Sequence, residues 1–464
     1  MLAIKVSDLI KATKGTLLNG SPDAVVNSFC TDSRKIKKGD MFVPLVGENF
    51  DGHKFLKEVM NLGACGFITS EEHDWQFDGD IREKIVIKVE ETLKAFQQTA
   101  EFHRNKFDIP VIGVTGSAGK TSTKDMIYEV LSKKYKVLKN EGNLNNQIGL
   151  PMTLLNLKAE HEVAVVEMGM SSFGEISTLS KIAKPHISII TNIGLAHIGK
   201  LGSRQNIHKA KMEIFDGMEP DGLVCLNGDD GLLFGLKDLL KYTTEFYGLQ
   251  EGLNIKAYNV KVTDELYTTF NVEINSREYL FAVPIPGMYC VYNALAAICV
   301  GLRFKIAIED IIEALKDYKP SSMRMNIMNL SKEIKLINDA YNANPNSMEE
   351  ALRVMKNLPG PRKIAVLGDM LELGEWTRQA HIDIGKSVVK NGINHLVALG
   401  KNSKYIAEGA ADAGMSQRKI YTCDDIYDVN EYIKGLIRDG DVILVKGSRG
   451  MKMEGIVDFI SGVI

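Results

Sequence analysis

The sequence lacks a long apolar run and an excess of charge of one sign. Its 464 residues include 56 Lys and Arg against 59 Asp and Glu, a formal net charge of −3. Duplex-binding proteins usually carry a basic excess, so the charge gives no global reason to expect nucleic acid. No run approaches the roughly 20 apolar residues that span a bilayer. Residues 1–8 have no long apolar core, so we expect neither membrane insertion nor a signal peptide.

Cysteine is scarce, and no two cysteines form a Cys-x-x-Cys pair. Most lie among apolar neighbours, which predicts buried, reduced thiols in a cytoplasmic protein and argues against a zinc site or a catalytic cysteine. The six are Cys30, Cys65, Cys225, Cys290, Cys299 and Cys423.

Length and composition predict a globular protein of several domains. Hydrophobic residues make up 45% and charged residues 25%, which are ordinary values for a soluble fold. At about 150 residues per domain the chain has room for roughly three. We expect an N-terminal domain at 1–90, a central domain at 91–322 and a C-terminal domain at 323–464.

Alternation of apolar strands with helices predicts an α/β fold in all three domains. In the N-terminal domain we expect strands at 41–46 and 84–90 and a helix at 54–62. In the central domain, continuous apolar strands predict a mostly parallel sheet covered on both faces, and residues 254–283 alternate with period two, which predicts an antiparallel hairpin. The expected central strands are 109–114, 163–168, 187–191 and 223–226. The expected C-terminal strands, in a Rossmann-like unit, are 335–337, 364–367, 396–399 and 442–445.

A glycine-rich turn is the strongest local signal. It follows a predicted strand and opens a predicted helix, as a phosphate-binding loop must. Glycines allow backbone N–H groups to surround phosphate oxygens, a lysine adds charge at the β- and γ-phosphates, and a threonine hydroxyl can bind Mg²⁺. Val114 stands where the strict motif has its first glycine, so the loop is a variant. It comprises Gly113, Val114, Thr115, Gly116, Ser117, Ala118, Gly119, Lys120 and Thr121.

Three further side chains follow the central strands. Glu167 ends one strand, where a carboxylate faces the ligand crevice and can bind Mg²⁺, and His197 lies in the loop after the next strand. Lys211 lies in a predicted helix. Each pattern is also that of an ordinary surface residue, so the residues alone leave both interpretations open.

In this order, Gly-x-x-Gly-x-x-Gly-Lys-Thr, Glu-Met-Gly, Thr-Asn-Ile-Gly-x-x-His and Ala-Lys-x-Glu-Ile resemble the Mur ligases of bacterial peptidoglycan synthesis. The blocks at 338–348 and 367–375 are similar to the branch that adds D-alanyl-D-alanine to UDP-N-acetylmuramoyl-tripeptide. Residues 31–53 resemble that branch's UDP-binding domain.

The resemblance implies an ATP- and Mg²⁺-dependent ligase that activates the peptide's terminal carboxylate as an acyl phosphate. It implies that Thr121 and Glu167 hold one Mg²⁺, and that His197 and a carbamylated Lys211 hold a second. It also implies a cytoplasmic enzyme, for which we expect a monomer that closes over its substrates. By the same resemblance, nucleotide contacts are Asn293, Arg324, Asp339 and Asn342, and substrate contacts are Ser33, Arg34, Asp51, His53, Asn143, Asn145, Asn146, Lys446 and Arg449.

One segment departs from the family. Tyr289 and Cys290 replace the usual His-Asn pair before Asn293. The alternatives are the sister ligase that adds the third residue, a folylpolyglutamate synthase, and a nucleotide-dependent binding module without chemistry. This sequence lacks the block with which the sister ligase usually recognises its amino acid, and a folylpolyglutamate synthase would not need the UDP-binding domain.

Overall fold

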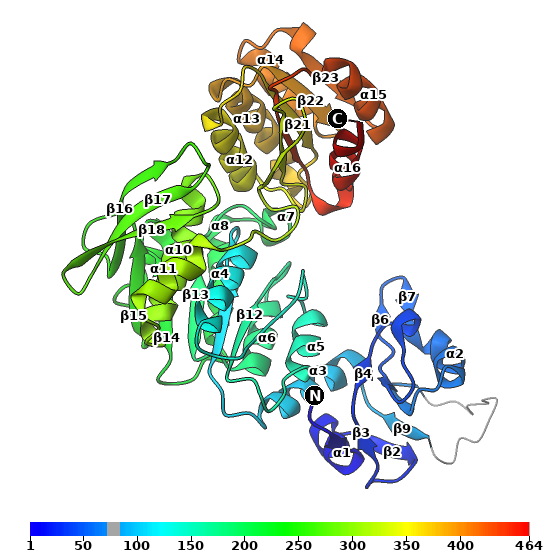
Figure 1. Ribbon diagram of the computed structural model, residues 1–464. Coiled ribbons are helices and arrows are strands. Elements are labelled where there is room, and N and C mark those ends of the chain that lie inside the picture. The colour runs from blue at the N-terminus through cyan, green and yellow to red at the C-terminus, as the bar shows by residue number, and fades with distance from the viewer. Residues whose placement is uncertain (72–83, 464) are drawn as a thin grey trace.

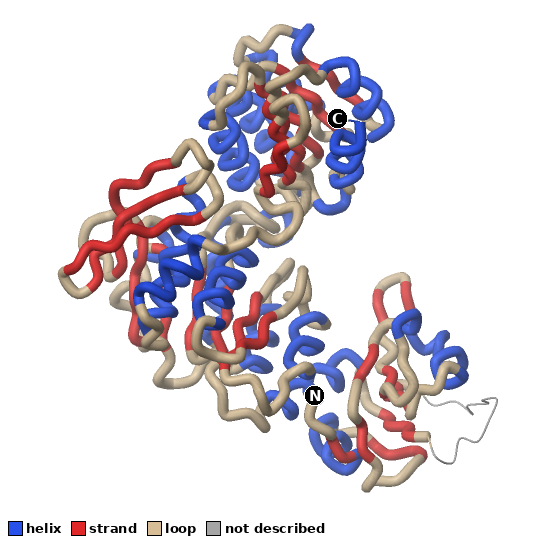
Figure 2. The backbone as a smooth tube through the Cα atoms, in the orientation of Figure 1, coloured by secondary structure: helices blue, strands red, loops and turns tan. Residues whose placement is uncertain are grey.

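The computed structural model describes residues 1–71 and 84–463, and these fold into three α/β units that follow one another along the chain (Figures 1 and 2). The α/β fold class is confirmed. The exact domain boundaries stay predictions.

The N-terminal unit is built on a sheet of strand order β2-β9-β8-β5-β4. The expected strand at 41–46 is wrong in length, because β5 stops before Pro44, which has no N–H to donate to a ladder. The strands are β1 (Ile4–Lys5), β2 (Thr16–Asn19), β3 (Val25–Val26), β4 (Phe29–Cys30), β5 (Met41–Phe42), β6 (Val46–Gly47), β7 (Phe50–Asp51), β8 (Gly66–Thr69) and β9 (Ile85–Lys88). The helices are α1 (Val6–Thr13) and α2 (Leu56–Asn61), with 3₁₀ turns η1 (Ser33–Lys35) and η2 (Gly52–Phe55).

The central unit has the strand order β11-β12-β10-β13-β14-β15-β16-β17-β18. Strands β10 to β15 are parallel, as expected. The expected hairpin is three antiparallel strands, and it continues the main sheet because β16 pairs with β15 at Tyr247 and Gly248. The strands are β10 (Val111–Thr115), β11 (Val137–Lys139), β12 (Val163–Glu167), β13 (Ile187–Ile190), β14 (Leu223–Asn227), β15 (Thr243–Gly248), β16 (Ile255–Val262), β17 (Thr268–Ile274) and β18 (Arg277–Val283).

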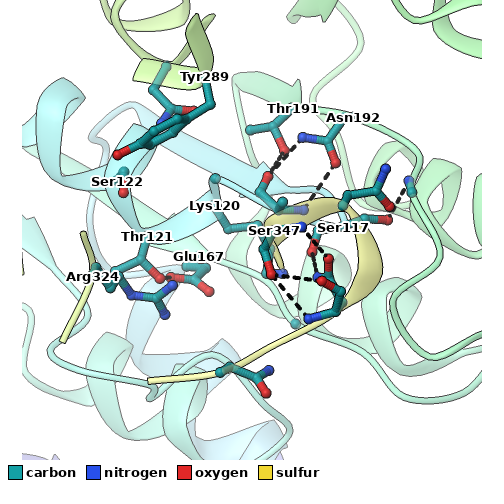
Figure 3. Close-up of a pocket in the computed structure, with 18 of the residues that line it drawn as sticks. Ser117, Lys120, Thr121, Ser122, Glu167, Thr191, Asn192, Tyr289, Arg324 and Ser347 are labelled. Carbon is teal, nitrogen blue, oxygen red and sulfur yellow. Dashed lines mark hydrogen bonds between the residues drawn. The ribbon is translucent and has the colours of Figure 1, made fainter. Parts of the chain in front are cut away.

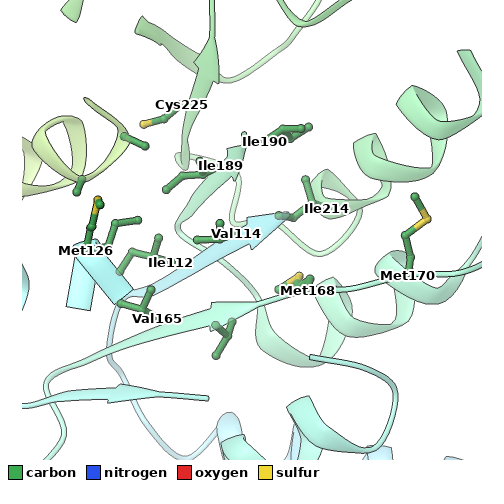
Figure 4. Close-up of a cluster of buried hydrophobic side chains, with 14 of the residues drawn as sticks. Ile112, Val114, Met126, Val165, Met168, Met170, Ile189, Ile190, Ile214 and Cys225 are labelled. Atoms are coloured by element: carbon green, nitrogen blue, oxygen red, sulfur yellow. The ribbon is translucent and has the colours of Figure 1, made fainter. Parts of the chain in front are cut away.

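Helices cover the central sheet, and apolar side chains fill the space between (Figure 4). Ile112, Val165 and Ile189, from three neighbouring strands, are fully buried, as is Met126 of α4. The helices are α3 (Thr92–Arg104), α4 (Lys120–Ser132), α5 (Gly149–Leu155), α6 (Glu175–Ala183), α7 (Ile198–Leu201), α8 (Arg204–Met212), α9 (Gly231–Phe234), α10 (Met288–Arg303) and α11 (Ile308–Lys316), with η4 (Glu213–Phe215). Among the described residues, no helix is long and apolar enough to cross a membrane.

The C-terminal unit has the strand order β19-β20-β24-β21-β22-β23, parallel except for β19. The strands are β19 (Asn326–Asn329), β20 (Lys335–Asn338), β21 (Lys363–Gly368), β22 (His395–Leu399), β23 (Ile420–Cys423) and β24 (Val442–Lys446). The helices are α12 (Pro345–Asn357), α13 (Thr377–Lys390), α14 (Lys404–Asp412), α15 (Ile426–Leu436) and α16 (Glu454–Val463), with η5 (Gly374–Trp376), η6 (Gln417–Lys419) and η7 (Arg449–Met451).

The central and C-terminal units touch beside the glycine-rich loop. The N–H of Leu195 donates to Asn346 Oδ1 over 3.2 Å, and the N–H of Gly199 donates to the carbonyl of Glu372 over 3.1 Å. A Cβ at Gly199 would lie 2.6 Å from the backbone nitrogen of Gly374, so this approach needs glycine. The contact brings the C-terminal unit to the carboxyl ends of the central strands, where α/β folds bind ligands.

Candidate active site

A cleft of about 1260 Å³ lies where these two units meet (Figure 3). The glycine-rich loop and the loops after β12 and β13 form one wall. Residues that follow β20 and β24, together with the N-terminal part of α12, form the other. The site is therefore built from segments as far apart in the chain as Leu93 and Arg449.

Two glycines shape the loop. Gly116 has φ 150° and Gly119, which precedes α4, has φ 81°. A Cβ at Gly116 would lie 1.8 Å from Thr191 Oγ1, and one at Gly119 would lie 2.6 Å from Asn293 Oδ1. Both positions combine a backbone conformation that favours glycine with a close neighbour, so a larger residue would displace the loop.

The loop is held from the side by residues that follow β13. Asn192 Oδ1 accepts a hydrogen bond from the N–H of Ala118 at 3.0 Å, and its carbonyl accepts from the N–H of Ser117 at 3.0 Å. Thr191 Oγ1 donates to the carbonyl of Ala118 at 2.6 Å. The sequence analysis did not name Thr191 or Asn192 as site residues, although a polar pair directly after a buried strand was the available signal.

The predicted loop is longer than the observed one. Gly113, Val114 and Thr115 lie inside the buried strand β10 and do not line the cleft. Thr115 Oγ1 donates a hydrogen bond to the carbonyl of Met168 at 2.8 Å. These three residues position the loop, and the part that lines the cleft begins at Ser117.

Lys120 begins α4 and its ammonium folds back over the loop. Nζ donates to the carbonyl of Gly116 at 2.8 Å. Burial lowers the pKa of Lys120 and the charge of Arg324 adds to that, while the carboxylate of Glu167 opposes both. Two cations and one carboxylate therefore converge at the start of α4, whose N-terminus also favours anions.

Glu167 is buried at the end of β12, with 1% of its surface exposed. Thr121 Oγ1 donates to Glu167 Oε2 at 2.8 Å, and Asn145 Nδ2 donates to Glu167 Oε1 at 2.6 Å. Asn140 holds the backbone of the same residue, since Asn140 Oδ1 accepts the Glu167 N–H at 2.9 Å. The structure thus brings together the two predicted magnesium ligands, Thr121 and Glu167, with one predicted substrate residue, Asn145.

His197 precedes α7 in a left-handed conformation, φ 64°. Its Nδ1 lies 2.6 Å from Oε2 of Glu372, a residue of the C-terminal unit that is also left-handed, φ 63°. The imidazole holds the pKa of the Glu372 carboxyl below its usual value. His197 lines the cleft, and its ring is fixed from the other unit.

Lys211 lies in α8 with 2% of its surface exposed. It does not line the cleft, and within the described residues its ammonium has no hydrogen bond or ion pair. Desolvation by burial lowers its pKa well below the usual value, and the Lys120 charge lowers it further. An unpaired, buried lysine close to Lys120 is unusual for a purely structural residue.

The predicted nucleotide contacts all line the cleft. Asn293 Oδ1 accepts from Thr123 Oγ1 at 3.1 Å, while its Nδ2 is buried without a partner in the described structure. The guanidinium of Arg324 stacks 4.0 Å from the centre of the Tyr341 ring. An unsatisfied buried amide beside the loop is the kind of group that a bound ligand would complete.

Asp339, Asn342 and Lys446 form a local network. Lys446 Nζ donates to Asp339 Oδ2 at 2.5 Å and to the carbonyl of Asn342 at 2.9 Å. Asp339 Oδ1 also accepts the N–H of Met325 at 3.0 Å. In this structure Lys446 ties the strand ends β20 and β24 together, and its ammonium is already paired.

The remaining substrate candidates near the cleft have mixed surroundings. Asn143 and Asn146 line it, but Asn146 Oδ1 accepts the N–H groups of Ile148 and Gly149 at the start of α5, a capping role. Arg449 also lines the cleft, and its Nη1 lies 3.0 Å from Glu454 Oε1.

The four N-terminal candidates lie outside this cleft. Ser33 begins η1, and Arg34 is exposed and bidentate to Asp32, with both distances 2.8 Å. His53 is buried. Its Nε2 accepts the Ser70 N–H at 3.3 Å, so its Nδ1 donates to Asp51 Oδ1 at 2.8 Å. The N–H of His53 is the largest cause that lowers the pKa of the Asp51 carboxyl.

The two departures at the start of α10 have different environments. Tyr289 lines the cleft, and its hydroxyl is buried without a partner in the described structure. Cys290 is fully buried, and its thiol donates to the carbonyls of Ile285 at 3.2 Å and Gly287 at 3.0 Å. Burial raises the pKa of the Cys290 thiol to about 12. The replacement therefore adds a phenol to the cleft and a thiol to the core.

Comparisons with known proteins agree along the whole chain. Family models match in three segments: Mur ligase family, catalytic domain, at residues 26–104; Mur ligase middle domain at 114–301; and Mur ligase, glutamate ligase domain, at 323–449. UDP-N-acetylmuramoyl-tripeptide–D-alanyl-D-alanine ligase of Bacillus subtilis is 39% identical over 459 residues, 98% of each chain.

Solved structures show the same similarity. A MurF crystal structure from Acinetobacter baumannii superposes with a TM-score of 0.91 at 31% identity, over 99% of each chain. MurF ligase from Thermotoga maritima in complex with ADP gives a TM-score of 0.82 at 27% identity, over 94% of this chain and 98% of that one.

Proposed function

The chain belongs to the Mur ligase family, and we propose that the cleft between its central and C-terminal units performs the family's ligation with the residues described above. It is an ATP-dependent ligase that joins D-alanyl-D-alanine to UDP-N-acetylmuramoyl-tripeptide in peptidoglycan precursor synthesis. The roles of individual residues are our proposal.

One observation carries these roles. Glu167 is buried between Thr121 and Asn145, directly beside the loop that Lys120 covers (Figure 3). A nucleoside triphosphate in this loop would place its terminal phosphate against Lys120 and Arg324. Phosphoryl transfer needs such positioned cations, because an anionic carboxylate must approach an anionic phosphate.

The first step forms an acyl phosphate. An oxygen of the tripeptide's terminal carboxylate attacks the γ-phosphorus, an O–P bond forms, and the bond to the ADP oxygen breaks. Lys120 and Arg324 neutralise the charge that moves onto ADP. We assign the nucleoside contacts to Asn293 and Tyr289, because Asn293 Nδ2 and the Tyr289 hydroxyl are buried without a partner in the described structure.

The donor set around Glu167 fits Mg²⁺. A threonine hydroxyl and a carboxylate are hard oxygen ligands, and both are fixed by hydrogen bonds in the structure. When bound, the ion would neutralise phosphate charge and align the reacting oxygens. Asn145 keeps Glu167 turned toward Thr121.

Lys211 is the proposed carbamate. Only a neutral amine attacks CO₂, and burial together with the Lys120 charge favours the neutral form of Lys211. In the reaction an N–C bond forms and the amine loses a proton, which turns the side chain into an oxygen ligand. His197, fixed by Glu372, would complete a second cation site with it.

The second step makes the amide. The amine of D-alanyl-D-alanine attacks the acyl carbon, the bond to the phosphate oxygen breaks, and the nitrogen gives up a proton. We assign the dipeptide to the C-terminal unit and the UDP end to the N-terminal unit. Because Ser33, Arg34, Asp51 and His53 do not line the cleft, the N-terminal unit is expected to move when substrate binds. Identical scattering profiles with and without substrates would contradict this.

An acceptor panel tests the function. The purified chain, ATP and magnesium are mixed with UDP-N-acetylmuramoyl-tripeptide and D-alanyl-D-alanine, or with the corresponding UDP-N-acetylmuramoyl-dipeptide and diaminopimelate or lysine, and ADP release is followed. Turnover only with D-alanyl-D-alanine supports the assignment. Turnover with another amine favours a sister ligase, and no turnover with any acceptor favours a binding module.

A further inference from the structure

A second polar cluster lies within the central unit, away from the cleft. Cys225 Sγ and Cys299 Sγ are 3.3 Å apart, and the Cys299 thiol donates to Glu245 Oε2 at 2.8 Å. All three side-chain ligand atoms lie within 4.8 Å of one another. None of these residues lines the cleft.

The fold brings the three together from distant segments. Cys225 of β14 and Glu245 of β15 are direct partners in a parallel ladder, so their side chains point to the same face of the sheet. Cys299 lies on α10, which packs across both strands. The cluster is thus positioned by regular structure on every side.

The environment leaves the carboxylate without a cation. Cys225 and Cys299 are 0% and 1% exposed, while Glu245 is half-buried. Within the described residues Glu245 has no ion-pair partner, and its side chain bonds only to the Cys299 thiol. This half-buried carboxylate, whose only partner among those residues is a thiol, therefore has oxygen lone pairs free for a cation.

Glu245 is the most exposed member of the cluster, since it is half-buried while both cysteines are buried. The side of the cluster nearest to solvent is therefore the side of the carboxylate.

We propose that Cys225, Cys299 and Glu245 bind a thiophilic divalent cation of the Zn²⁺ class. Two sulfur ligands and one carboxylate match this class, and a water on the side of Glu245 would complete a tetrahedron. At a Zn–S distance of about 2.3 Å the sulfurs would lie roughly 3.8 Å apart, so they need to separate by only about 0.5 Å. Binding forms two metal–sulfur bonds and releases the two thiol protons to solvent.

This site differs from the expectation drawn from cysteine spacing, which argued against zinc. Local spacing did not reveal the site because Cys225 and Cys299 are 74 residues apart, and the three ligands lie on three different elements. An ion here would tie α10, the helix of Asn293, to the sheet beside the nucleotide loop. The inference does not depend on the proposed ligase roles.

Cadmium titration of the full-length protein tests the site, since Cd²⁺ bound to thiolates gives a charge-transfer absorption band. The protein is first freed of metal with a chelator. We expect one tight equivalent in the native chain, lost in Cys299→Ala and bound at least about tenfold more weakly in Glu245→Gln. Cys290→Ala is the matched control, because Cys290 is an equally buried cysteine on the same helix. It is expected to keep the equivalent.

The proposal is overturned if the native chain binds no tight equivalent, or if Cys299→Ala retains it fully. Circular dichroism checks that each variant folds. If Cys299→Ala does not fold, the half-buried Glu245→Gln decides, and unchanged cadmium affinity in that variant also overturns the proposal.

Discussion

Gly116→Ala is the substitution that the geometry of the phosphate loop predicts most sharply. The new Cβ would lie 1.8 Å from Thr191 Oγ1, at a residue with φ 150°. A backbone conformation of this kind costs an ordinary residue about 1–3 kcal/mol, and overpacking typically adds about 1–3 kcal/mol. We expect the free energy of unfolding to fall by roughly 2–6 kcal/mol, or the loop to shift so that the new Cβ avoids Thr191.

Both the strained loop and the shifted loop are expected to change how the nucleotide binds. A shift of about 1 Å in Lys120 and Thr121 is expected to lower kcat/KM for ATP about a hundredfold. Gly252→Ala is the control: Gly252 has φ 79°, but nothing lies within 4 Å of its added Cβ. That variant is expected to lose about 1–2 kcal/mol and keep its ATP kinetics.

A double variant separates the two causes. Thr191→Ala removes Oγ1 and part of the overlap, so Gly116→Ala with Thr191→Ala should lose less stability than the sum of the single changes. Thermal unfolding and ATP-dependent ADP release measure both effects. Gly116→Ala with the melting temperature and KM of the native chain would refute the reasoning about this loop.

Three further outcomes are expected. Asn145→Ala removes the hydrogen bond to Glu167 Oε1. We expect the magnesium concentration that gives half-maximal activity to rise about 10–100-fold, and an unchanged magnesium titration of activity would contradict this. Lys211→Ala should abolish the stimulation by added bicarbonate that we expect for the native chain, and full activity in this variant without CO₂ would exclude the carbamate. Burial lowers the pKa of His103 to about 4 from 6.5. As pH falls, His103 takes up its proton in the unfolded chain before it does so in the folded chain. The contribution of neutral His103 to folding stability is therefore complete above about pH 6.5 and is lost as pH falls toward 4. Melting temperatures of the native chain should fall more steeply over that range than those of His103→Gln.

Local patterns predicted those parts of the molecule that depend on neighbouring residues. The glycine–lysine–threonine turn and the strand end at Glu167 were visible in the sequence because their chemistry lies within a few positions. The parallel strands β10, β12, β13 and β14 were visible as apolar runs. Short or mixed strands such as β11 (Val137–Lys139) and β15 (Thr243–Gly248) were missed, since neither has a continuous apolar pattern.

Contacts between distant segments could not be predicted in this way. The support that Asn192 gives to Ala118 joins residues 74 positions apart, and Glu372 reaches His197 from another unit. Lys446 lines the cleft, and its pairing with Asp339, 107 residues away, could not be read from the sequence, while its contact with substrate stays a prediction. Such partners are set by how the units dock, and the sequence periodicity carries no information on docking.

The central claim is that the loop at Lys120 holds ATP so that its terminal phosphate passes to a peptide carboxylate, which D-alanyl-D-alanine then attacks. A stopped-time assay that measures ADP and the new dipeptide-extended product in the same samples tests it most directly. The account predicts one ADP for each product formed, and loss of both in Lys120→Ala. Product without ADP, or ADP release that continues at the same rate without either substrate, would contradict it.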